Sequence, residues 1–359
     1  MNTKDQILLE KAYTEVKQEG ILRNSVCNCC GSILTKEEIY HSNQRQLNEE
    51  RVNSNGYIIY HGISNGEKIV CIATGFNDRS SNEKTGPMIQ VYIMLADVEP
   101  TVAVKTGQDK GVCFNCAMRG KGCYVNLGQG VGNIYQSYKK GNYPSICPPN
   151  TKFDNTNVES KISTYLEMGD WDKFRGEYVR FGAYGEPIVI PFSIIEKIAN
   201  VSKGITGYTH QWKNPMFSSY KKYLMASIDT PSQYETAKNM GWKTFRISPN
   251  WFVKKKNEIP CTNAIDGTLC IDCLKCCGNS MNEKDIYIKV HGMAYKVNKF
   301  LSTFGRGDAA DDITPEELEQ INKINQKEAE RLKMLKINRK SRAEVKKLRM
   351  THFLIDFHK

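Results

Sequence analysis

Strand-like and helix-like segments alternate between residues 178 and 249, and this alternation limits the fold more than any other feature. The strand-like runs are YVRFGAYG, ITGYTHQW, LMASIDT and WKTFRISP, and the helix-like runs between them are PFSIIEKIANVSKG, NPMFSSYKKYL and PSQYETAKNMG. Strands separated by helices pair in parallel, because each helix carries the chain back to the starting end of the sheet. The sequence therefore predicts an α/β fold, and units of this length fit a partial (β/α) barrel as well as a doubly wound sheet.

The chain is predicted to contain an N-terminal region, a core and a tail: residues 1–87, 88–304 and 305–359. The N-terminal region has a cysteine group and a predicted hairpin, because two β-rich runs flank Asn65-Gly66, the strongest short hairpin-turn signal. The β/α core begins with the strand-like run MIQVYIML, contains the cysteine-rich insertions and ends after the strand-like run DIYIKVHG. The tail begins with a flexible hinge and continues as a long basic helix.

The chain of 359 residues contains 13 cysteines, most of them clustered. No apolar run approaches the roughly 18 residues needed to cross a bilayer, and the N-terminus lacks the layout of a signal peptide. We therefore expect a cytoplasmic protein without membrane segments, whose thiols stay reduced. Short-spaced thiols in that setting are more often metal ligands than disulfides. Cys71 stands alone in an apolar run, VCIATG, and is predicted to be a core residue.

A group of three cysteines follows the strand-like run MIQVYIML: Cys113, Cys116 and Cys123. Three thiolates hold an iron–sulfur cluster with one iron left open, or a zinc ion with one open position. An open position suits a reactive centre. The alternatives are a closed structural site with Cys147 as fourth ligand, and free thiols.

Four further cysteines follow the last β/α unit: Cys261, Cys270, Cys273 and Cys276. Four thiols at this spacing predict a closed metal site, with Cys277 left over. Zinc and iron–sulfur both fit, and the absence of histidine from the group favours iron–sulfur. A weaker group lies near the N-terminus: Cys27, Cys29 and Cys30.

Polar side chains gather where the predicted strands end, which is the edge at which parallel β/α sheets place functional sites. Four of them are predicted to be catalytic: Glu186, His210, Asp229 and Arg246. Asp229 has an alternative role as a helix cap, because it precedes Thr230-Pro231. His210 has an alternative role as a structural residue.

Over most of residues 56–292 the chain resembles a family of proteins encoded by bacteriophages and actinobacterial mobile elements. The matching segments include IVCIATGF, NEKTGPMIQVYIM, GVCFNCAMRGKGCYVNLGQG, RFGAYGEP, GYTHQW, MASIDT, GWKTFRI and CIDCLKC. That family has no established activity, so the resemblance implies an origin and, in a phage, the host cytoplasm as the compartment.

The order of elements also resembles that of radical S-adenosylmethionine enzymes. Those enzymes have a part-barrel of β/α units, three cysteines after the first strand, and a glycine–glutamate motif after the second strand that contacts the methionine amine. Gly185-Glu186-Pro187 is similar to that motif, although the cysteine spacing here is two residues and then six instead of three and then two. The resemblance implies a [4Fe–4S] cluster on the three cysteines, an auxiliary cluster on the four, and a part-barrel. It also implies that S-adenosylmethionine binds at strand ends: Gly185, Glu186, Tyr208 and Ser227.

The charge distribution suggests a different function. The net charge is +11, and residues 327–349 hold ten Lys or Arg against three Glu. A basic tail of this kind is typical of nucleic-acid contact, or of a solvated helix when the charges are mixed. The predicted function is therefore iron–sulfur and radical S-adenosylmethionine chemistry on an unknown substrate; the alternative is a zinc-stabilised protein that binds nucleic acid through its tail.

Overall fold

The computed structural model describes residues 54–80, 82–147, 158–250, 254–280 and 284–304, together with five single positions between 319 and 334. The group of Cys27, Cys29 and Cys30 and the predicted tail helix fall outside this part of the chain, apart from those single positions. No described helix is long and apolar enough to cross a membrane.

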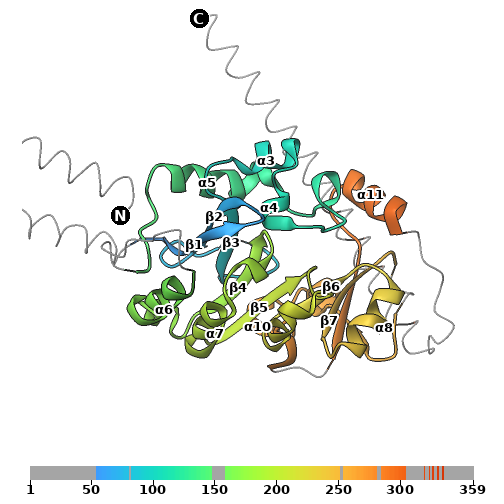
Figure 1. Ribbon diagram of the computed structural model, residues 1–359. Helices are drawn as coiled ribbons and strands as arrows, with labels where there is room; N and C mark the ends of the chain where they lie inside the picture. Colours follow the sequence, from blue (N-terminus) through green and yellow to red (C-terminus); the bar gives the residue numbers. More distant parts are fainter. Residues whose placement is uncertain are drawn as a thin grey trace, which may run out of the picture.

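One nine-stranded sheet organises the described residues (Figure 1). Its strands are β1 (Gly56–Ser64), β2 (Glu67–Thr74), β3 (Ile89–Leu95), β4 (Tyr178–Tyr184), β5 (Gly204–Thr209), β6 (Met225–Ile228), β7 (Thr244–Ser248), β8 (Glu258–Pro260) and β9 (Asp285–Lys289). The spatial order is β1-β2-β3-β4-β5-β6-β7-β9-β8. The sheet is open, with β1 and β8 at its two edges, so it is not a closed barrel.

The helices lie between and around these strands. The α-helices are α3 (Pro100–Thr106), α4 (Lys110–Cys113), α5 (Gly132–Lys139), α6 (Val158–Met168), α7 (Phe192–Val201), α8 (Pro231–Asn239), α9 (Thr262–Asp266), α10 (Cys270–Cys273) and α11 (Ala294–Phe304). Six short 3-10 or π segments complete them: η1 (Gly120–Gly122), η2 (Leu127–Val131), η3 (Trp171–Phe174), η4 (Pro187–Val189), η5 (Pro215–Lys222) and η6 (Gly278–Ser280).

The sheet changes from antiparallel to parallel at β3. β1 pairs antiparallel with β2 through a turn at Asn65 and Gly66, both at positive φ, and β2 pairs antiparallel with β3. From β3 to β9 every neighbouring pair is parallel, and β8 joins β9 in parallel at the edge. β1 and β2 therefore belong to the same sheet as the core strands, and the sheet runs across the predicted boundary at residue 87.

The α/β prediction and the parallel pairing are confirmed. All four strand-like runs between residues 178 and 249 are strands, and the helix-like runs between them form α7, η5 and α8. β8 and α11 were not predicted. β8 has only three residues and pairs with β9 at the edge of the sheet. Three residues are too few to show the apolar periodicity by which a strand is recognised in a sequence.

Helix packing covers one face of the sheet. α7 turns Ile194, Ile195 and Ile198 inward, and all three side chains are fully buried. These positions recur at helical spacing, so one apolar stripe of α7 packs on the sheet while its polar stripe faces water. Figure 1 shows α6, α7 and α8 along one side of the molecule and α3 and α5 on the opposite side, above β1–β3.

Candidate functional site

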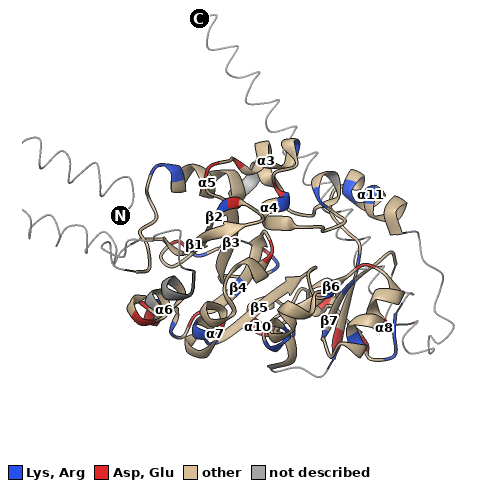
Figure 2. Ribbon diagram, in the orientation of Figure 1, with Lys and Arg blue, Asp and Glu red and all other residues tan. Residues whose placement is uncertain are grey.

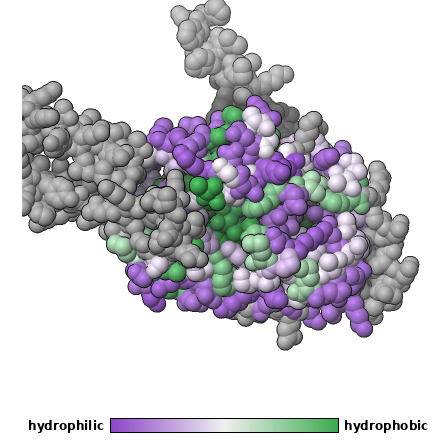
Figure 3. All heavy atoms as spheres, viewed as in Figure 1, coloured by the Kyte–Doolittle hydropathy of each residue, from purple (hydrophilic) through white to green (hydrophobic). Residues whose placement is uncertain are grey.

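A cavity of about 740 Å³ lies against one face of the parallel strands. Alternate residues of each strand line it, because successive side chains of a strand point to opposite faces. Examples are Arg180 and Gly182 of β4, Thr206 and Tyr208 of β5, and Phe245 and Ile247 of β7. Figure 3 shows a band of apolar residues across the middle of the molecule, between hydrophilic residues above and below.

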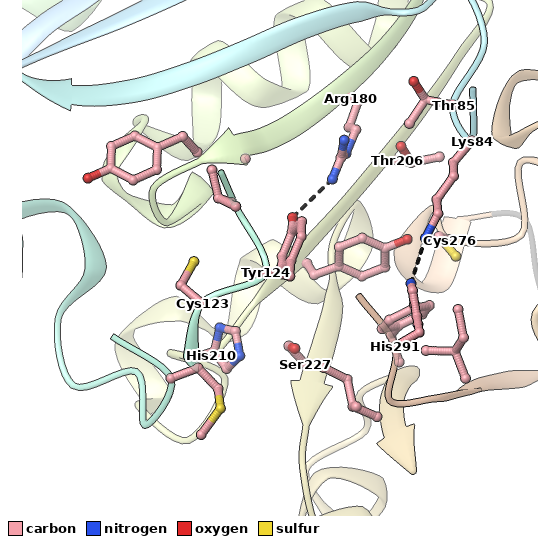
Figure 4. A pocket seen from close by; sticks show the side chains of 18 of the residues that line it. Lys84, Thr85, Cys123, Tyr124, Arg180, Thr206, His210, Ser227, Cys276 and His291 are labelled. Atoms are coloured by element: carbon pink, nitrogen blue, oxygen red, sulfur yellow. Dashed lines mark hydrogen bonds between the residues drawn. The ribbon is translucent and has the colours of Figure 1, made fainter. Parts of the chain in front are cut away.

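Both predicted cysteine sets line this one cavity. The first set is Cys113, Cys116 and Cys123, and the second set is Cys261, Cys270, Cys273 and Cys276. More than 130 residues separate the two sets in sequence. Figure 4 shows members of each, with Cys123 and Cys276 at different parts of the cavity wall. The fold therefore joins two sites that the sequence treats separately.

The thiols of the first set are close enough to affect one another. Burial raises the pKa of Cys113 well above its usual value, and the charges of Cys123, Glu186 and other neighbours raise it further. Burial also raises the pKa of Cys123, although a hydrogen bond from the main-chain N–H of Val125 to its sulfur opposes this. Cys113 and Cys123 are therefore protonated at neutral pH.

A hydrogen-bonded chain joins the first set to the ends of β4 and β5. The Glu186 carboxylate accepts hydrogen bonds from Thr209 Oγ1 at 2.8 Å and from the main-chain N–H of His210 at 3.0 Å. It also contacts His210 Nδ1 at 3.0 Å, and the His210 ring hydrogen-bonds the Cys116 thiol. Burial lowers the pKa of His210, but the bonds to Cys116 and Glu186 outweigh it and raise the pKa well above the usual value.

Gly185 and Glu186 occupy a tight loop at the end of β4. Gly185 has φ +79°, and a Cβ there would come within 2.5 Å of the Ile93 carbonyl oxygen. Glycine is needed for this approach to β3, whether or not a cofactor is near. The Glu186 side chain is 4% exposed and reaches across to β5. Its partners are thus His210 and Thr209.

The thiols of the second set also influence one another. Burial raises the pKa of Cys276 well above its usual value, and Cys261, Cys270 and Cys273 raise it further. Burial and the neighbouring thiols raise the pKa of Cys270 to about 11. Thr262 Oγ1 lies 3.1 Å from the Cys273 sulfur. The four thiols therefore lie near enough for their charges to act on one another.

Polar groups aim at individual sulfurs of the second set. The Cys261 sulfur accepts hydrogen bonds from the main-chain N–H groups of Asn263 and Ala264. Tyr208 is hydrogen-bonded to Cys276 and packs on Phe245 with ring centroids 4.4 Å apart. N–H groups directed at a sulfur stabilise its thiolate form. Nevertheless, among the described residues no three or more His, Cys, Asp or Glu side chains stand in the arrangement of a bound metal ion.

The predicted site residues divide between the cavity and the sheet interior. Gly185, Glu186, Tyr208, Ser227 and His210 all line the cavity. Asp229 and Arg246 are not among its lining residues, and Asp229 Oδ1 is buried with no hydrogen-bond partner among the described residues.

Arg246 points to the opposite face of β7 from its neighbours Phe245 and Ile247, because side chains alternate along a strand. Its Nε donates a hydrogen bond to Glu258 Oε1 at 2.6 Å, and both side chains are almost fully buried. Its ring-stacking partner is Tyr287, 5.7 Å from the guanidinium carbon. The guanidinium therefore holds β7 to β8, and the catalytic role predicted for it is without support.

Asp229 lies just before α8 and is 6% exposed. Thr230, not Asp229, caps α8 by accepting a hydrogen bond from the Gln233 N–H. Burial raises the pKa of Asp229, against the opposing effect of His210 and Lys213. Asp229 is therefore near His210 without lining the cavity.

Three of the described cysteines lie apart from both sets. Cys71 is fully buried in β2, which confirms its predicted core position. Cys147 is buried, with its sulfur 4.0 Å from the Tyr165 carbonyl oxygen, and does not line the cavity. Cys277 is buried and also lies off the cavity wall. This arrangement argues against Cys147 as a fourth ligand of the first set.

Several cavity residues were missed by sequence reasoning, among them Lys84, Tyr124 and Lys296. Lys296 of α11 donates a hydrogen bond from Nζ to the Val125 carbonyl oxygen at 2.9 Å, which ties α11 to the segment after Cys123. These residues belong to loops and to an unpredicted helix, and their sequence context carries no signal for the cavity. No protein-family model, curated protein or solved structure matches the chain.

Proposed function

We propose that this protein is an iron–sulfur protein that carries out radical S-adenosylmethionine chemistry on a small substrate held in the cavity. One observation carries the proposal: two cysteine sets from distant segments face one cavity on one face of a largely parallel sheet. Three thiolates of the first set would hold a [4Fe–4S] cluster with one open iron, and four of the second would hold a closed auxiliary cluster.

The donor sets fit such clusters chemically. Each set is composed of thiols, which are the ligands that iron–sulfur clusters prefer, and no disulfide joins any of the described cysteines. Main-chain N–H groups point at the Cys123 and Cys261 sulfurs, as they do toward ligating thiolates. Binding has to draw the thiols of each set together and release their protons, so it is coupled to local ordering.

The strand order supports a part-barrel. From β3 to β7 the strands follow one another in space in the order of the chain, without the reversal that defines a doubly wound sheet. The first cysteine set follows β3, Glu186 follows β4 and His210 follows β5. This is the order in which a radical S-adenosylmethionine enzyme presents its cluster and its cofactor-binding glutamate.

Glu186 and His210 have a defined part in the proposal. The Glu186 carboxylate lines the cavity next to the first set, where it would accept a hydrogen bond from the cofactor amine. Thr209 and His210 fix its orientation, which lowers the entropic cost of that contact. Gly185, Tyr208 and Ser227 complete the wall around it.

Metal analysis of protein purified without oxygen tests the proposal. Two [4Fe–4S] clusters predict roughly eight iron and eight sulfide per chain and a brown protein. Stoichiometric zinc without iron would overturn it and favour the alternative of a zinc-stabilised nucleic-acid-binding protein. Calorimetric titration of the reconstituted protein with S-adenosylmethionine is the second test, and absence of binding would reject the enzyme.

The nucleic-acid alternative depends on the basic tail. Along the ribbon in Figure 2, Lys and Arg occur among Asp and Glu over the described elements. Nucleic-acid-binding proteins usually cluster Lys and Arg on one face or along one helix, so this mixed distribution does not favour the alternative. The tail remains the feature that favours the alternative.

A further inference from the structure

Arg180 differs from the other arginines of the described residues in its partners. Each of the other four pairs with a carboxylate: Arg79 with Glu177, Arg119 with Asp109, Arg175 with Asp172 and Arg246 with Glu258. Arg180 has neutral partners, donating from Nη2 to the Tyr124 hydroxyl at 3.0 Å and from Nη1 to Gln90 Oε1 at 3.4 Å. Within the described residues no carboxylate lies at ion-pair distance from its guanidinium.

The side chains around Arg180 are phenols, an amide and a thiol. Burial lowers the pKa of the guanidinium, but Tyr124, Tyr208, Cys270 and Tyr92 raise it on balance. The guanidinium is therefore a half-buried positive charge whose protein neighbours are phenols and a thiol.

A second positive group faces the same cavity. Lys84 Nζ lies 2.6 Å from His291 Nε2, and His291 Nδ1 lies 2.8 Å from the Lys289 carbonyl oxygen. The carbonyl can only accept, so Nδ1 carries the ring proton and Nε2 accepts from the Lys84 ammonium. Figure 4 shows Arg180 and this Lys84–His291 pair around one space, with Tyr124 beside Arg180.

Arg180 also lies between the two cysteine sets. Its partner Tyr124 is adjacent in sequence to Cys123 of the first set, and its charge acts on Cys270 of the second set. A ligand group held at Arg180 therefore stands near both sets. The cavity, about 740 Å³, is within the range that encloses a small molecule.

We infer that Arg180, assisted by Lys84, binds a carboxylate or phosphate group of the substrate and positions it between the two cysteine sets. A guanidinium presents a planar fork of N–H groups that matches either oxyanion in two parallel hydrogen bonds. Tyr124 and Gln90 accept from two of its five N–H groups and orient the fork, which leaves three N–H groups to donate to a ligand. As the assignment of a substrate class, this inference rests on the proposed function.

Calorimetry with the full-length protein in its purified metal state tests the inference, using inorganic phosphate, pyrophosphate and malonate as probes at fixed ionic strength. Saturable binding of at least one probe is expected, and the preferred probe distinguishes a phosphate ligand from a carboxylate ligand. Arg180→Gln should weaken that binding about tenfold or more, and Lys84→Gln by about threefold. Arg175→Gln removes an exposed, carboxylate-paired guanidinium and should leave the affinity unchanged.

Three results would overturn the inference: no saturable binding, binding that Arg180→Gln leaves unchanged, or equal weakening by Arg175→Gln. Loss of probe binding when S-adenosylmethionine is saturating would also overturn it, because Arg180 would then hold the cofactor carboxylate instead of the substrate. Circular dichroism identifies any variant that fails to fold. If Arg180→Gln does not fold, the affinity of Lys84→Gln, a variant on an exposed loop, is compared with that of the wild type instead. Iron content, measured on the same samples, decides the proposed function separately.

Discussion

The two cysteine sets share one cavity but are attached to the protein in different ways. In the second set, the main chain is bonded to distant segments: the Cys261 N–H donates to Tyr287 of β9, the Cys270 N–H donates to Lys84, and the Cys276 carbonyl accepts from Gly207 of β5. In the first set, the Cys113 N–H donates to Asp109 and the Cys116 N–H donates to Cys113, both within the same loop. The main chain of the second set is thus bonded to distant segments, whereas Cys113 and Cys116 donate locally and their segment is tied to β4 through the Glu186 N–H, which donates to the Val112 carbonyl oxygen.

The side chains that surround the sulfurs also differ between the two sets. The first set adjoins the polar chain of Cys116, His210 and Glu186, which offers hydrogen-bonding groups to a bound molecule. The second set adjoins Tyr208 and Phe245, and its thiols mainly affect one another. A loop with polar neighbours suits a centre that exchanges ligands, and a set bonded into the sheet suits a centre that stays closed.

The largest loss of stability is expected from substitutions in the second set. Cys270→Ser or Cys273→Ser should greatly reduce the yield of folded protein, because a closed four-thiolate metal site contributes on the order of 10 kcal/mol to folding in small domains. Cys116→Ser should leave a folded protein. Thermal unfolding and metal content of the variants measure the difference, and equal collapse of both would mean that both sets are structural.

A smaller loss of stability is expected from breaking the Arg246–Glu258 ion pair, which supports the second set. Arg246→Gln leaves the buried Glu258 carboxylate, on the strand that leads to Cys261, without its cation. It should lower the free energy of unfolding by about 3–5 kcal/mol. Arg175→Gln, at an exposed pair, should cost less than about 1 kcal/mol.

Urea unfolding measures both arginine variants. If Arg246→Gln kept full stability and instead abolished activity, the structural role assigned to this residue would be wrong and the catalytic one would return.

Glu186→Gln tests whether the first set adjoins the cofactor site. The amide keeps the size of the side chain but loses the charge that faces the cofactor amine. S-adenosylmethionine should therefore bind about tenfold more weakly, or ~1.4 kcal/mol. Glu177→Gln, at a solvent-facing pair with Arg79, is the matched control and should bind normally. Calorimetry that finds equal affinity for wild type and Glu186→Gln would remove Glu186 from the cofactor site.

The smallest effect on stability is expected from removing residues 314–359. The sheet and the cavity are built from residues before 305, so the deletion should change the free energy of unfolding by less than about 1 kcal/mol. If the tail binds nucleic acid, the deletion should also abolish salt-sensitive retention on DNA or RNA, because that affinity comes from counterion release. Retention that persists would exclude the tail as the binding element.

Sequence patterns located the strands better than they located the site. Arg246 was predicted from its position near the end of β7, but strand alternation turns it away from the cavity while Phe245 and Ile247 face inward. The same alternation places Arg180 and Tyr208 in the cavity. The two-residue period thus separates Arg180 of β4, which lines the cavity, from Arg246 of β7, which does not.

The sequence by itself determined the local features of the protein. Apolar runs of strand length separated by helical runs specify the β/α units, and closely spaced thiols specify two cysteine sets, because both signals depend on residues within a few positions of one another. The tertiary structure alone decided that both sets face one cavity, that His210 joins Cys116 to Glu186, and that none of the described carboxylates pairs with Arg180. Those facts depend on how strands far apart in the chain align in one sheet, and that alignment is set by the packing of the whole core.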